Sequence, residues 1–571
     1  VTLRYGVFYD EDVICRAVEV ENTGTDVLHL NRVMSMSMDF LTGEYELVHF
    51  YGRHFHEMNP ERTPVGHGCF AIGSRRGVSG HQHNPFAMLA ESGAGEEHGA
   101  VYGMALMYSG NFILEAQQDQ YSQTRVQMGV SDERFDFLLD CGEHFFTPEV
   151  IMAFSDSGFG RLSHIFHRFI RNNVCREPYK LSRRPILVNN WEATYFDFTG
   201  EKLVEIAAEA AKLGIEMFVL DDGWFGERGP DDRGLGDWYV NTGKLGGELK
   251  DTVDKINALG LKFGLWIEPE MVNENSALYR AHPDWAMTIP GKPPVLGRSQ
   301  LVLDFTRADV RTAIYDMICA VIDSANVEYI KMDMNRSICE AYSALAERQN
   351  FGELCYKYVL GVYDFIERLR TRYPDMLIEG CSSGGARFDA GMMYYTPQIW
   401  TSDNTDAIER LRIQYGASFG YPISVVGSHV SAVPNHQNGR ITDIDTRAAV
   451  AMSGNFGYEL DLTKLSDEDK DKIRCQIEAF KADWELIHNG LYYRVTDWPD
   501  KSGYMAWNSV SPDGAHALLT AVTTDSSGTD YGNPVVIYVR CKGLDAHARY
   551  VCRETGMTLS GSELMFIGIP L

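Results

Sequence analysis

The sequence has little of what marks several common protein classes. Its eleven cysteines include no CxxC pair and no metal-finger spacing, and an odd number of cysteines in so long a chain is typical of reduced thiols. No apolar run approaches the roughly 20 residues that cross a bilayer. We therefore expect no membrane span, no metal site and a cytoplasmic location.

Positive charge is also scarce. There are 52 basic residues against 79 acidic ones, which gives a formal net charge of −27. This balance disfavours nucleic acid and anionic membrane surfaces as partners. The chain also has no GxGxxG after a predicted strand and no GxxxxGK[ST], so we expect no nucleotide and no other cofactor. A neutral, small-molecule substrate remains.

The chain is long enough for several domains. At 571 residues and 44% hydrophobic content it exceeds one compact core, so two to four domains are expected. Alternating strand patterns dominate residues 1–180, which we assign to an N-terminal β-sandwich domain. Short apolar strands followed by amphipathic helices fill residues 181–490. Short strands return in residues 491–571, which we assign to a C-terminal β-sandwich domain.

The middle segment contains eight βα units. A helix ends at Gly214, a common stop residue, and the last helix opens at Ser466 in capping-box spacing with Asp469 and ends at Gly490. Eight such units in about 300 residues predict an α/β fold with a central (β/α)₈ TIM barrel, whose active sites gather at the C-terminal ends of the strands. The predicted strands are residues 186–191, 217–224, 262–270, 329–335, 377–383, 399–404, 423–430 and 456–462.

The fourth strand, in YIKMDMNR (residues 329–336), has two different faces. Alternation places Lys331, Asp333 and Asn335 on one face and apolar residues on the other. Most of the other strands also end in polar residues, and a buried carboxylate costs several kcal/mol unless it is paired. So many acidic groups at one barrel mouth indicate a functional site. These strand-end residues are Asp221, Asp222, Glu268, Glu270, Asp333, Cys381 and Asp403.

Tryptophans accompany these polar strand ends. Trp191, Trp224, Trp266 and Trp400 lie there, and aromatic faces beside carboxylates and amides suit a sugar, which offers both apolar C–H faces and hydroxyls. Packing within the barrel is the alternative for each of them. Together with the carboxylates, the tryptophans favour a carbohydrate-binding site.

Two carboxylates are what glycoside hydrolysis requires, one as acid and one as nucleophile or base. We predict Asp333 as the nucleophile, held ionised by Lys331 on the same strand face. We predict Asp403 as the acid, with its pKa raised by desolvation after an apolar strand and Trp400.

Rival interpretations use the same residues. Lys331 could form a Schiff base in a lyase, but that requires a depressed pKa, which the neighbouring Asp333 opposes. A non-catalytic sugar-binding barrel would be expected to lack one carboxylate of the pair, and both are present. The histidines in HFH (residues 54–56) and HQH (residues 81–83) suggest a metal site, yet no third ligand stands at informative spacing. We expect these histidines to be hydrogen-bonded polar side chains.

Several long motifs in order resemble the α-galactosidases of glycoside hydrolase family 36. The similarity covers nearly the whole chain. The motifs are SRRGVSGHQHNPF (residues 74–86), LDDGWFGER (220–228), GLWIEPEMVN (264–273), IKMDMNR (330–336), EGCSSGGARFD (379–389) and WTSDNTDAIERL (400–411).

The resemblance implies a function and a set of site residues. It implies a retaining mechanism with Asp333 as nucleophile and Asp403 as acid/base, and no cofactor. The implied substrates are galactose-containing oligosaccharides such as melibiose and raffinose. Residues that the resemblance or their strand position assigns to the sugar subsite are Asp221, Asp222, Trp191, Trp266, Arg298, Lys331, Asn335, Cys381, Gly384 and Trp400.

Family members are often homotetramers, so the resemblance also implies an oligomer. Because bacterial members are longer at the N-terminus, it implies in addition that the N-terminal sandwich is incomplete. An α-N-acetylgalactosaminidase is the alternative within the family, and Cys381 and Gly384 match the α-galactosidase pattern instead.

Overall fold

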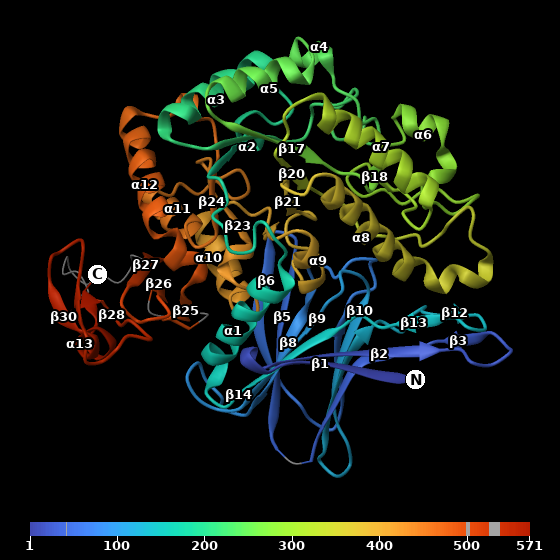
Figure 1. Ribbon diagram of the computed structural model, residues 1–571, viewed down its shortest axis with the longest axis horizontal. Helices are drawn as coiled ribbons and strands as arrows, with labels where there is room; N and C mark the ends of the chain where they lie inside the picture. The colour runs from blue at the N-terminus through green and yellow to red at the C-terminus, as the bar shows by residue number, and fades with distance from the viewer. Residues whose placement is uncertain (42, 498–502, 525–536, 571) are drawn as a thin grey trace.

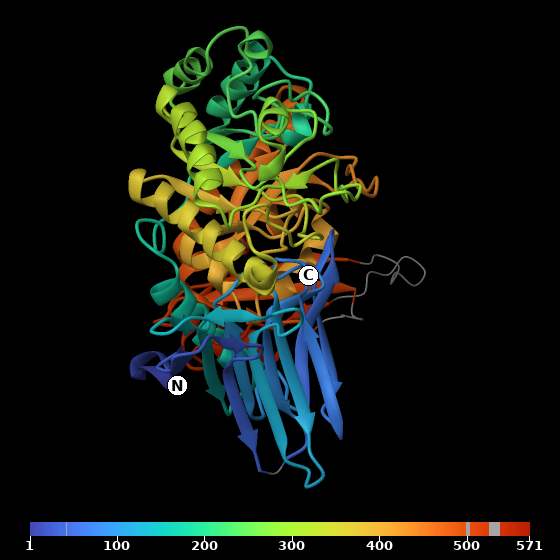
Figure 2. The ribbon, with the colours of Figure 1, turned by 90° about the vertical axis from the view of Figure 1, so that its right-hand side faces the viewer.

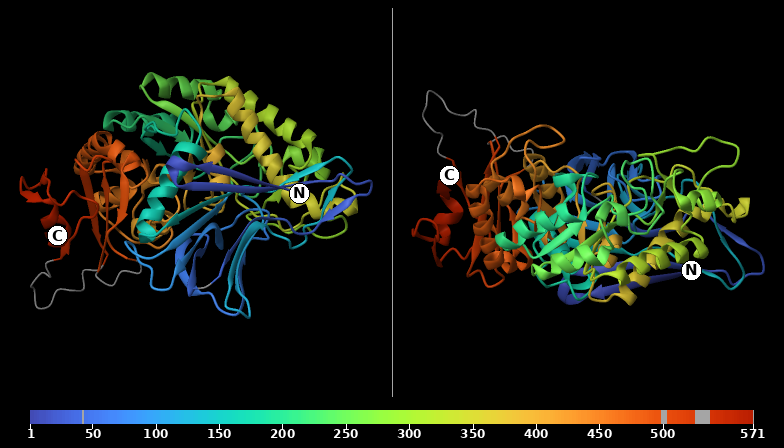
Figure 3. Two further views of the ribbon diagram at one scale, coloured as in Figure 1. Left: turned by 60° about the horizontal axis from the view of Figure 1, so that its bottom comes forward. Right: turned by 90° about the horizontal axis from the view of Figure 1, so that it is seen from above.

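The structure is a computed structural model that describes residues 1–41, 43–497, 503–524 and 537–570. A β-rich N-terminal part lies beside a central barrel, and strands of the C-terminal part lie at one end of the molecule (Figures 1 and 3). Figure 2 shows the long N-terminal strands running away from the barrel. Among the described residues no helix is long and apolar enough to cross a membrane. All eleven cysteines are described, and none is in a disulfide.

The N-terminal part is a β-sandwich, as predicted. One sheet has the order β1-β2-β14-β9-β8-β5-β6, with β13 on β2, and it faces a second sheet of order β10-β11-β4. Apolar side chains from both sheets, such as Met36, Leu89 and Phe112, are buried between them. The strands are β1 Thr2–Phe8, β2 Val13–Glu21, β4 Met34–Phe40, β5 Tyr45–Arg53, β6 His56–Pro64, β8 His83–Glu91, β9 Val101–Leu106, β10 Phe112–Gln118, β11 Thr124–Val130, β13 His144–Phe146 and β14 Val150–Ser155.

Smaller sheets complete the two ends. In the N-terminal part β3 Leu28–Leu30 pairs with β12 Phe137–Leu139, and α1 Gly158–Phe169 leads toward the barrel. The C-terminal part contains the antiparallel sheet β25-β26-β27 and the pairs β28-β31 and β29-β30. These elements are β25 Leu491–Arg494, β26 Tyr504–Val510, β27 Ala517–Thr523, β28 Tyr538–Val539, β29 Arg549–Val551, β30 Thr558–Ser560, α13 Gly561–Phe566 and β31 Ile569–Pro570.

The middle of the chain forms a closed barrel of eight parallel strands, and every one of the eight predicted strands takes part in it. Neighbouring strands are joined in register, for example Leu187 opposite Met217 and Lys331 opposite Glu379. The barrel confirms the predicted fold class. Its strands are β15 Leu187–Asn189, β16 Met217–Leu220, β17 Lys262–Ile267, β20 Tyr329–Met332, β21 Leu377–Gly380, β22 Gln398–Trp400, β23 Val426–Ser431 and β24 Asn455–Glu459.

Seven of the eight barrel strands end earlier than predicted, whereas β23 runs one residue further, to Ser431. The fourth, β20, ends at Met332. The Asp333 N–H still donates to Ile267 O on β17 at 2.8 Å, but the two N–H groups after it bond to side chains. Met334 N–H donates to the Asp333 carboxylate and Asn335 N–H donates to Glu268. Most of the predicted site residues therefore lie in the loops that leave the strands, whereas Trp266, Lys331 and Trp400 lie within β17, β20 and β22.

Helices surround the barrel and begin and end where capping chemistry predicts. Helix α3 ends at Leu213 before Gly214, whose φ is +89°. In α12, the Ser466 side chain accepts a hydrogen bond from Asp469 N–H. The principal helices are α3 Gly200–Leu213, α5 Leu249–Ala258, α7 Ala308–Ser324, α8 Leu354–Arg372, α10 Ala407–Ala417, α11 Ile444–Ala451 and α12 Asp467–Asn489, with the short helices α2 Trp191–Thr194, α4 Thr242–Leu245, α6 Ala277–Ala281 and α9 Ala390–Tyr395.

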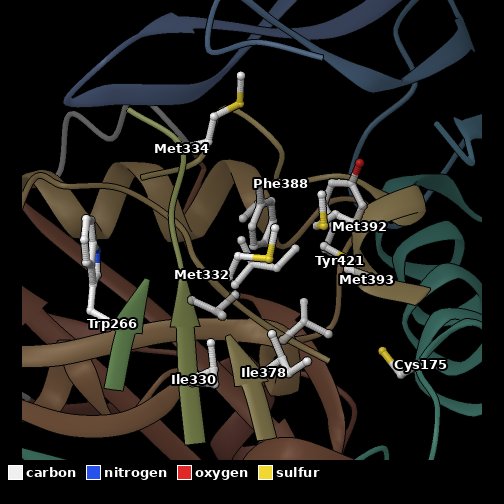
Figure 4. Close-up of a cluster of buried hydrophobic side chains, with 14 of the residues drawn as sticks. Cys175, Trp266, Ile330, Met332, Met334, Ile378, Phe388, Met392, Met393 and Tyr421 are labelled. Carbon is white, nitrogen blue, oxygen red and sulfur yellow. The ribbon is translucent and has the colours of Figure 1, made fainter. Parts of the chain in front are cut away.

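The two faces of β20 have different surroundings, as the alternation predicts. Figure 4 shows Met332 directed toward Phe388 and Met392, on the side away from Trp266. Ile330 and Met332 are almost fully buried in this apolar cluster. Packing of one face holds β20 in place, so the opposite face can present Lys331 to the barrel interior.

Candidate active site

The candidate site is built from the end of β17 and from the loops that follow β16, β20, β21 and β22. Trp266 and Ser383 both donate to Asp333, Asp221 accepts from Lys331, and the loop after β21 packs closely against the loop that carries Asp403. The carboxyl ends of the strands in a closed parallel barrel meet at one mouth. The sequence-based expectation that these residues converge is therefore met.

Asp333 accepts hydrogen bonds at both carboxylate oxygens. Its Oδ1 accepts from Met334 N–H at 2.8 Å and from Ser383 N–H at 3.2 Å. Its Oδ2 accepts from the Asn335 side-chain amide at 2.6 Å and from Trp266 Nε1–H at 3.3 Å. Four donors, from β17 and from the loops after β20 and β21, fix the orientation of this carboxylate.

Lys331 does not pair with Asp333, contrary to the prediction. Its Nζ donates to Asp221 Oδ2 at 2.9 Å, and both side chains are buried. Asn189 donates to the same oxygen of Asp221 at 2.6 Å. The lysine stem is long enough to reach Asp221 inside the barrel, whereas four other donors already satisfy Asp333. Lys331 therefore stabilises Asp221.

The pKa of Lys331 argues against Schiff-base chemistry. Burial lowers this pKa, but the negative charge of Asp221 and of other acidic groups nearby raises it well above its usual value. A lysine that attacks a carbonyl must lose its proton near neutral pH. Lys331 remains a cation, so the lyase interpretation is not favoured.

Asp222 and Arg298 are both close to the charge of Asp231. The fully buried Arg228 donates to Asp222 through Nε at 3.0 Å and Nη2 at 2.8 Å. Burial raises the pKa of Asp222 although Arg228 opposes this. Arg298 donates to Asp231 at 3.4 Å, and the charges of Glu268, Asp231, Asp333 and Asp403 raise its pKa against the effect of burial.

Asp403 is held from two sides. Trp400 Nε1–H donates to its Oδ1 at 3.1 Å, and His54 Nε2 lies 2.9 Å from its Oδ2. Burial raises the pKa of Asp403, but the hydrogen bond and charge of His54, with the charges of Lys331 and Arg298, outweigh it. The net pKa lies below its usual value. The prediction that desolvation raises the pKa of Asp403 is therefore wrong.

Gly384 is located where any side chain would collide with the loop that carries Asp403. Its φ is +76°, and an added Cβ would lie 2.6 Å from Asp403 N and 2.8 Å from Ser402 Cα. Cys381 is buried, and its backbone N–H donates to Met332 O at 2.7 Å. Gly384 therefore sets how closely the loops after β21 and β22 approach.

The four tryptophans at the predicted strand ends have different partners. Trp266 and Trp400 each donate an indole N–H to one of the two candidate catalytic carboxylates. Trp191 is the first residue of α2. Its backbone N–H donates to Asn189 Oδ1, and the Asn189 side-chain amide donates to Asp221. Asn335 bridges Asp333 and the Ser383 hydroxyl. Trp224 donates its indole N–H to Trp266 O at 2.9 Å and not to a carboxylate.

The structure also places at the site residues to which sequence reasoning assigned no specific role. Glu268, predicted only as one of the acidic strand ends, follows β17 and accepts from Gln300 at 3.1 Å, and burial together with the charge of Asp333 raises its pKa to about 8. His54 and Glu57 come from the sandwich, where their spacing carries no barrel signal. No group of three or more His, Cys, Asp or Glu side chains in the described part of the chain is arranged to hold a metal ion.

Family models match along the whole chain. One described as Melibiase matches residues 144–490, and those for the N-terminal and C-terminal domains of glycosyl hydrolase family 36 match residues 1–140 and 504–571. The chain belongs to glycoside hydrolase family 36. The predicted resemblance is thereby confirmed.

Named α-galactosidases are similar to this chain over its full length. It is 52% identical to the bifunctional alpha-galactosidase/sucrose kinase AgaSK of Mediterraneibacter gnavus, covering 100% of this chain and 60% of that protein. It is 47% identical to alpha-galactosidase AgaA of Geobacillus stearothermophilus, with 100% and 78% covered. The crystal structure of AgaA superimposes with a TM-score of 0.97 at 46% identity, covering 100% and 78%. The chain thus spans only part of these longer relatives.

Replacing Gly384 with alanine is expected to destabilise the protein more than replacing Gly260. Both glycines have positive φ, which strains alanine by about 1–3 kcal/mol, but nothing lies within 4 Å of a Cβ at Gly260. The close contact at Gly384 adds overpacking of about 1–3 kcal/mol. Scanning calorimetry of both variants should show the larger fall in melting temperature for Gly384→Ala. Equal falls would contradict the close approach.

Proposed function

We propose that this protein is a retaining α-galactosidase in which Asp333 is the nucleophile and Asp403 is the acid/base. The observation that carries the proposal is the pair of carboxylates after β20 and β22, each oriented by a tryptophan N–H at one barrel mouth. Retaining glycosidases use two such carboxylates, one as nucleophile and one as proton donor. The family assignment supports the same chemistry.

The proposed reaction proceeds in two displacements. Asp333 attacks the anomeric carbon while Asp403 gives a proton to the departing glycosidic oxygen, which leaves a galactosyl ester on Asp333. Asp403 then takes a proton from water, which attacks the same carbon and releases Asp333. Because each displacement inverts the carbon, the product keeps the α configuration.

The proposed substrates are terminal α-linked galactosides such as melibiose and raffinose. Crystal structures of AgaA variants, whose sequence is 46% identical, are described as complexes with raffinose and with stachyose. In the proposed sugar subsite the Asp221–Lys331 and Asp222–Arg228 pairs supply fixed charged groups for hydroxyl hydrogen bonds. Trp191, Arg298, Asn335, Cys381 and Gly384 would complete the subsite.

Two further expectations accompany the proposal. Assembly into a homotetramer is expected by analogy with the family, and a cytoplasmic location follows from composition and free cysteines. Analytical ultracentrifugation would test the first expectation and fractionation of the source cells the second.

Proton NMR of an aryl α-galactoside reaction is the first test of this function. α-Galactose should appear at the earliest times, before mutarotation, because two inversions restore the configuration. Early β-galactose would contradict the double displacement. If the enzyme hydrolysed the aryl α-N-acetylgalactosaminide but not the aryl α-galactoside, it would instead be an α-N-acetylgalactosaminidase.

Replacing Asp333 with alanine should reduce kcat/KM by several orders of magnitude, because no other group can form the galactosyl intermediate. Azide should restore part of the turnover and yield the β-galactosyl azide by a single inversion. The surface variant Asp323→Ala on α7 is a matched control for removal of a carboxylate. Near-normal rates in Asp333→Ala would refute the assignment of the nucleophile.

Replacing Asp403 with alanine should affect substrates according to their leaving groups. Hydrolysis of melibiose should fall by roughly 10²- to 10⁴-fold, the usual contribution of general acid catalysis. The first step on a dinitrophenyl galactoside, which needs no proton, should be affected much less. Burst kinetics would separate this step from the slowed second one. Equal losses in the first step on both substrates would reject the acid role.

A further inference from the structure

A hairpin of the N-terminal sandwich reaches the mouth of the barrel. Strand β5 ends at Arg53 and β6 begins at His56, and between them His54 places its Nε2 2.9 Å from Asp403 Oδ2. The two residues are 349 positions apart in the sequence. Neither domain's sequence pattern alone could therefore have predicted the contact.

Contacts on both sides of Asp403 fix the hairpin tip. Asn404 donates its side-chain amide to Phe55 O at 3.0 Å, and the Ser402 hydroxyl donates to Glu57 Oε2 at 2.6 Å. Phe55 adopts φ +67°, and its ring lies 3.8 Å from the His54 ring, centroid to centroid. The tip is thus bonded to the residue before Asp403 and to the residue after it.

The charged groups around this contact come from several elements. Glu57 on β6 and Arg298 in the loop before β19 (Leu301–Val302) act on His54, and the His81 ring lies 5.5 Å from it. His81 itself lies 2.7 Å from Ser383 O. Lys331 and Arg298 act on Asp403 from the barrel. Among these groups His54 is the titratable one that contacts the Asp403 carboxylate directly.

We propose that His54 is a positioning residue that shares with Asp403 the proton used in the reaction. The inference rests on the proposed function. In the resting site one proton resides on the pair, between His54 Nε2 and Asp403 Oδ2. When the glycosidic C–O bond breaks, this proton goes to the departing oxygen and leaves neutral His54 beside the Asp403 carboxylate. Attack by water then returns one proton to the pair, so the cycle balances.

The electrostatics of the pair agree with this arrangement. Partial burial lowers the pKa of His54, but the hydrogen bond and charge of Asp403, with the charge of Glu57, raise it above its usual 6.5. Burial raises the pKa of Asp403, but the hydrogen bond and charge of His54 lower it most among its neighbours, so that it lies below its usual value. The pair therefore keeps its proton to a higher pH than an isolated carboxyl would. The alkaline limit of kcat/KM should report loss of this proton.

Replacing His54 with glutamine keeps a donor near Asp403 but removes the titrating group. We expect the alkaline limb of kcat/KM to move to lower pH by about one unit or more, since Asp403 must then hold the proton against Lys331 and Arg298. At pH 7 kcat/KM on melibiose should fall by roughly tenfold or more, with a smaller loss on a dinitrophenyl galactoside. His54→Phe, which also removes the donor, should show the larger loss.

His56→Gln is the matched control. This histidine lies two residues along the same hairpin and faces Glu409 at 3.9 Å, so its pH profile should superimpose on that of the unmodified protein. A His54→Gln enzyme with an unshifted alkaline limb would overturn the proposal. The same holds if His54→Gln and His56→Gln shift equally, because a general effect on the hairpin would then explain both.

NMR titration tests the pair without any turnover. The imidazole signal missing from His54→Gln identifies His54, whose pKa should be above 6.5 in the unmodified protein and should fall in Asp403→Asn. An unchanged pKa would refute the pairing. Failure of the proposed function would appear differently, as absence of galactose release by the unmodified enzyme, whereas failure of this inference leaves that release intact.

Discussion

Pairing of buried charge is the constraint on which the barrel mouth depends. An ion removed from water costs several kcal/mol unless a partner and hydrogen bonds compensate it. Asp221 has Lys331, Asp222 has Arg228, and Glu270 has Arg387 at 2.8 Å. The loop after β16 folds inward to bring Arg228 to Asp222, so much of the irregular structure above the strands follows from this requirement.

The same constraint joins the domains. Asp403 has its second hydrogen-bond partner in His54, and Ser402 in the same loop donates to Glu57. The sandwich therefore supplies hydrogen-bond partners for the barrel loop that carries Asp403. Within the barrel, glycines let the loops after β21 and β22 approach each other, because a Cβ at Gly385 would lie 2.3 Å from Thr401 O and one at Gly384 would lie 2.6 Å from Asp403 N. The interface between the domains and the proposed active site are therefore one structure.

The fold could be predicted largely from local patterns. Period-two apolar runs located all eight barrel strands, and a capping serine and a stop glycine located helix ends, because these signals act within a few residues. Alternation also gave the correct face for Lys331. Alternation could not predict which carboxylate pairs with Lys331, because a lysine side chain reaches across the barrel and several carboxylates lie within its range. His54 was missed because contacts between distant segments leave no periodic trace, and the pKa of Asp403 depends on that contact.

The short hairpin between β5 and β6 has an evolutionary consequence. Both flanks of Asp403 are tied to residues 55 and 57, so inserting or deleting even one residue at the tip would shift His54 by about 3.3 Å along the strand direction. Loop tips usually tolerate such changes. Here the length of the tip is constrained as strictly as the identity of a residue, and recombination that exchanged the sandwich for another would have to preserve it.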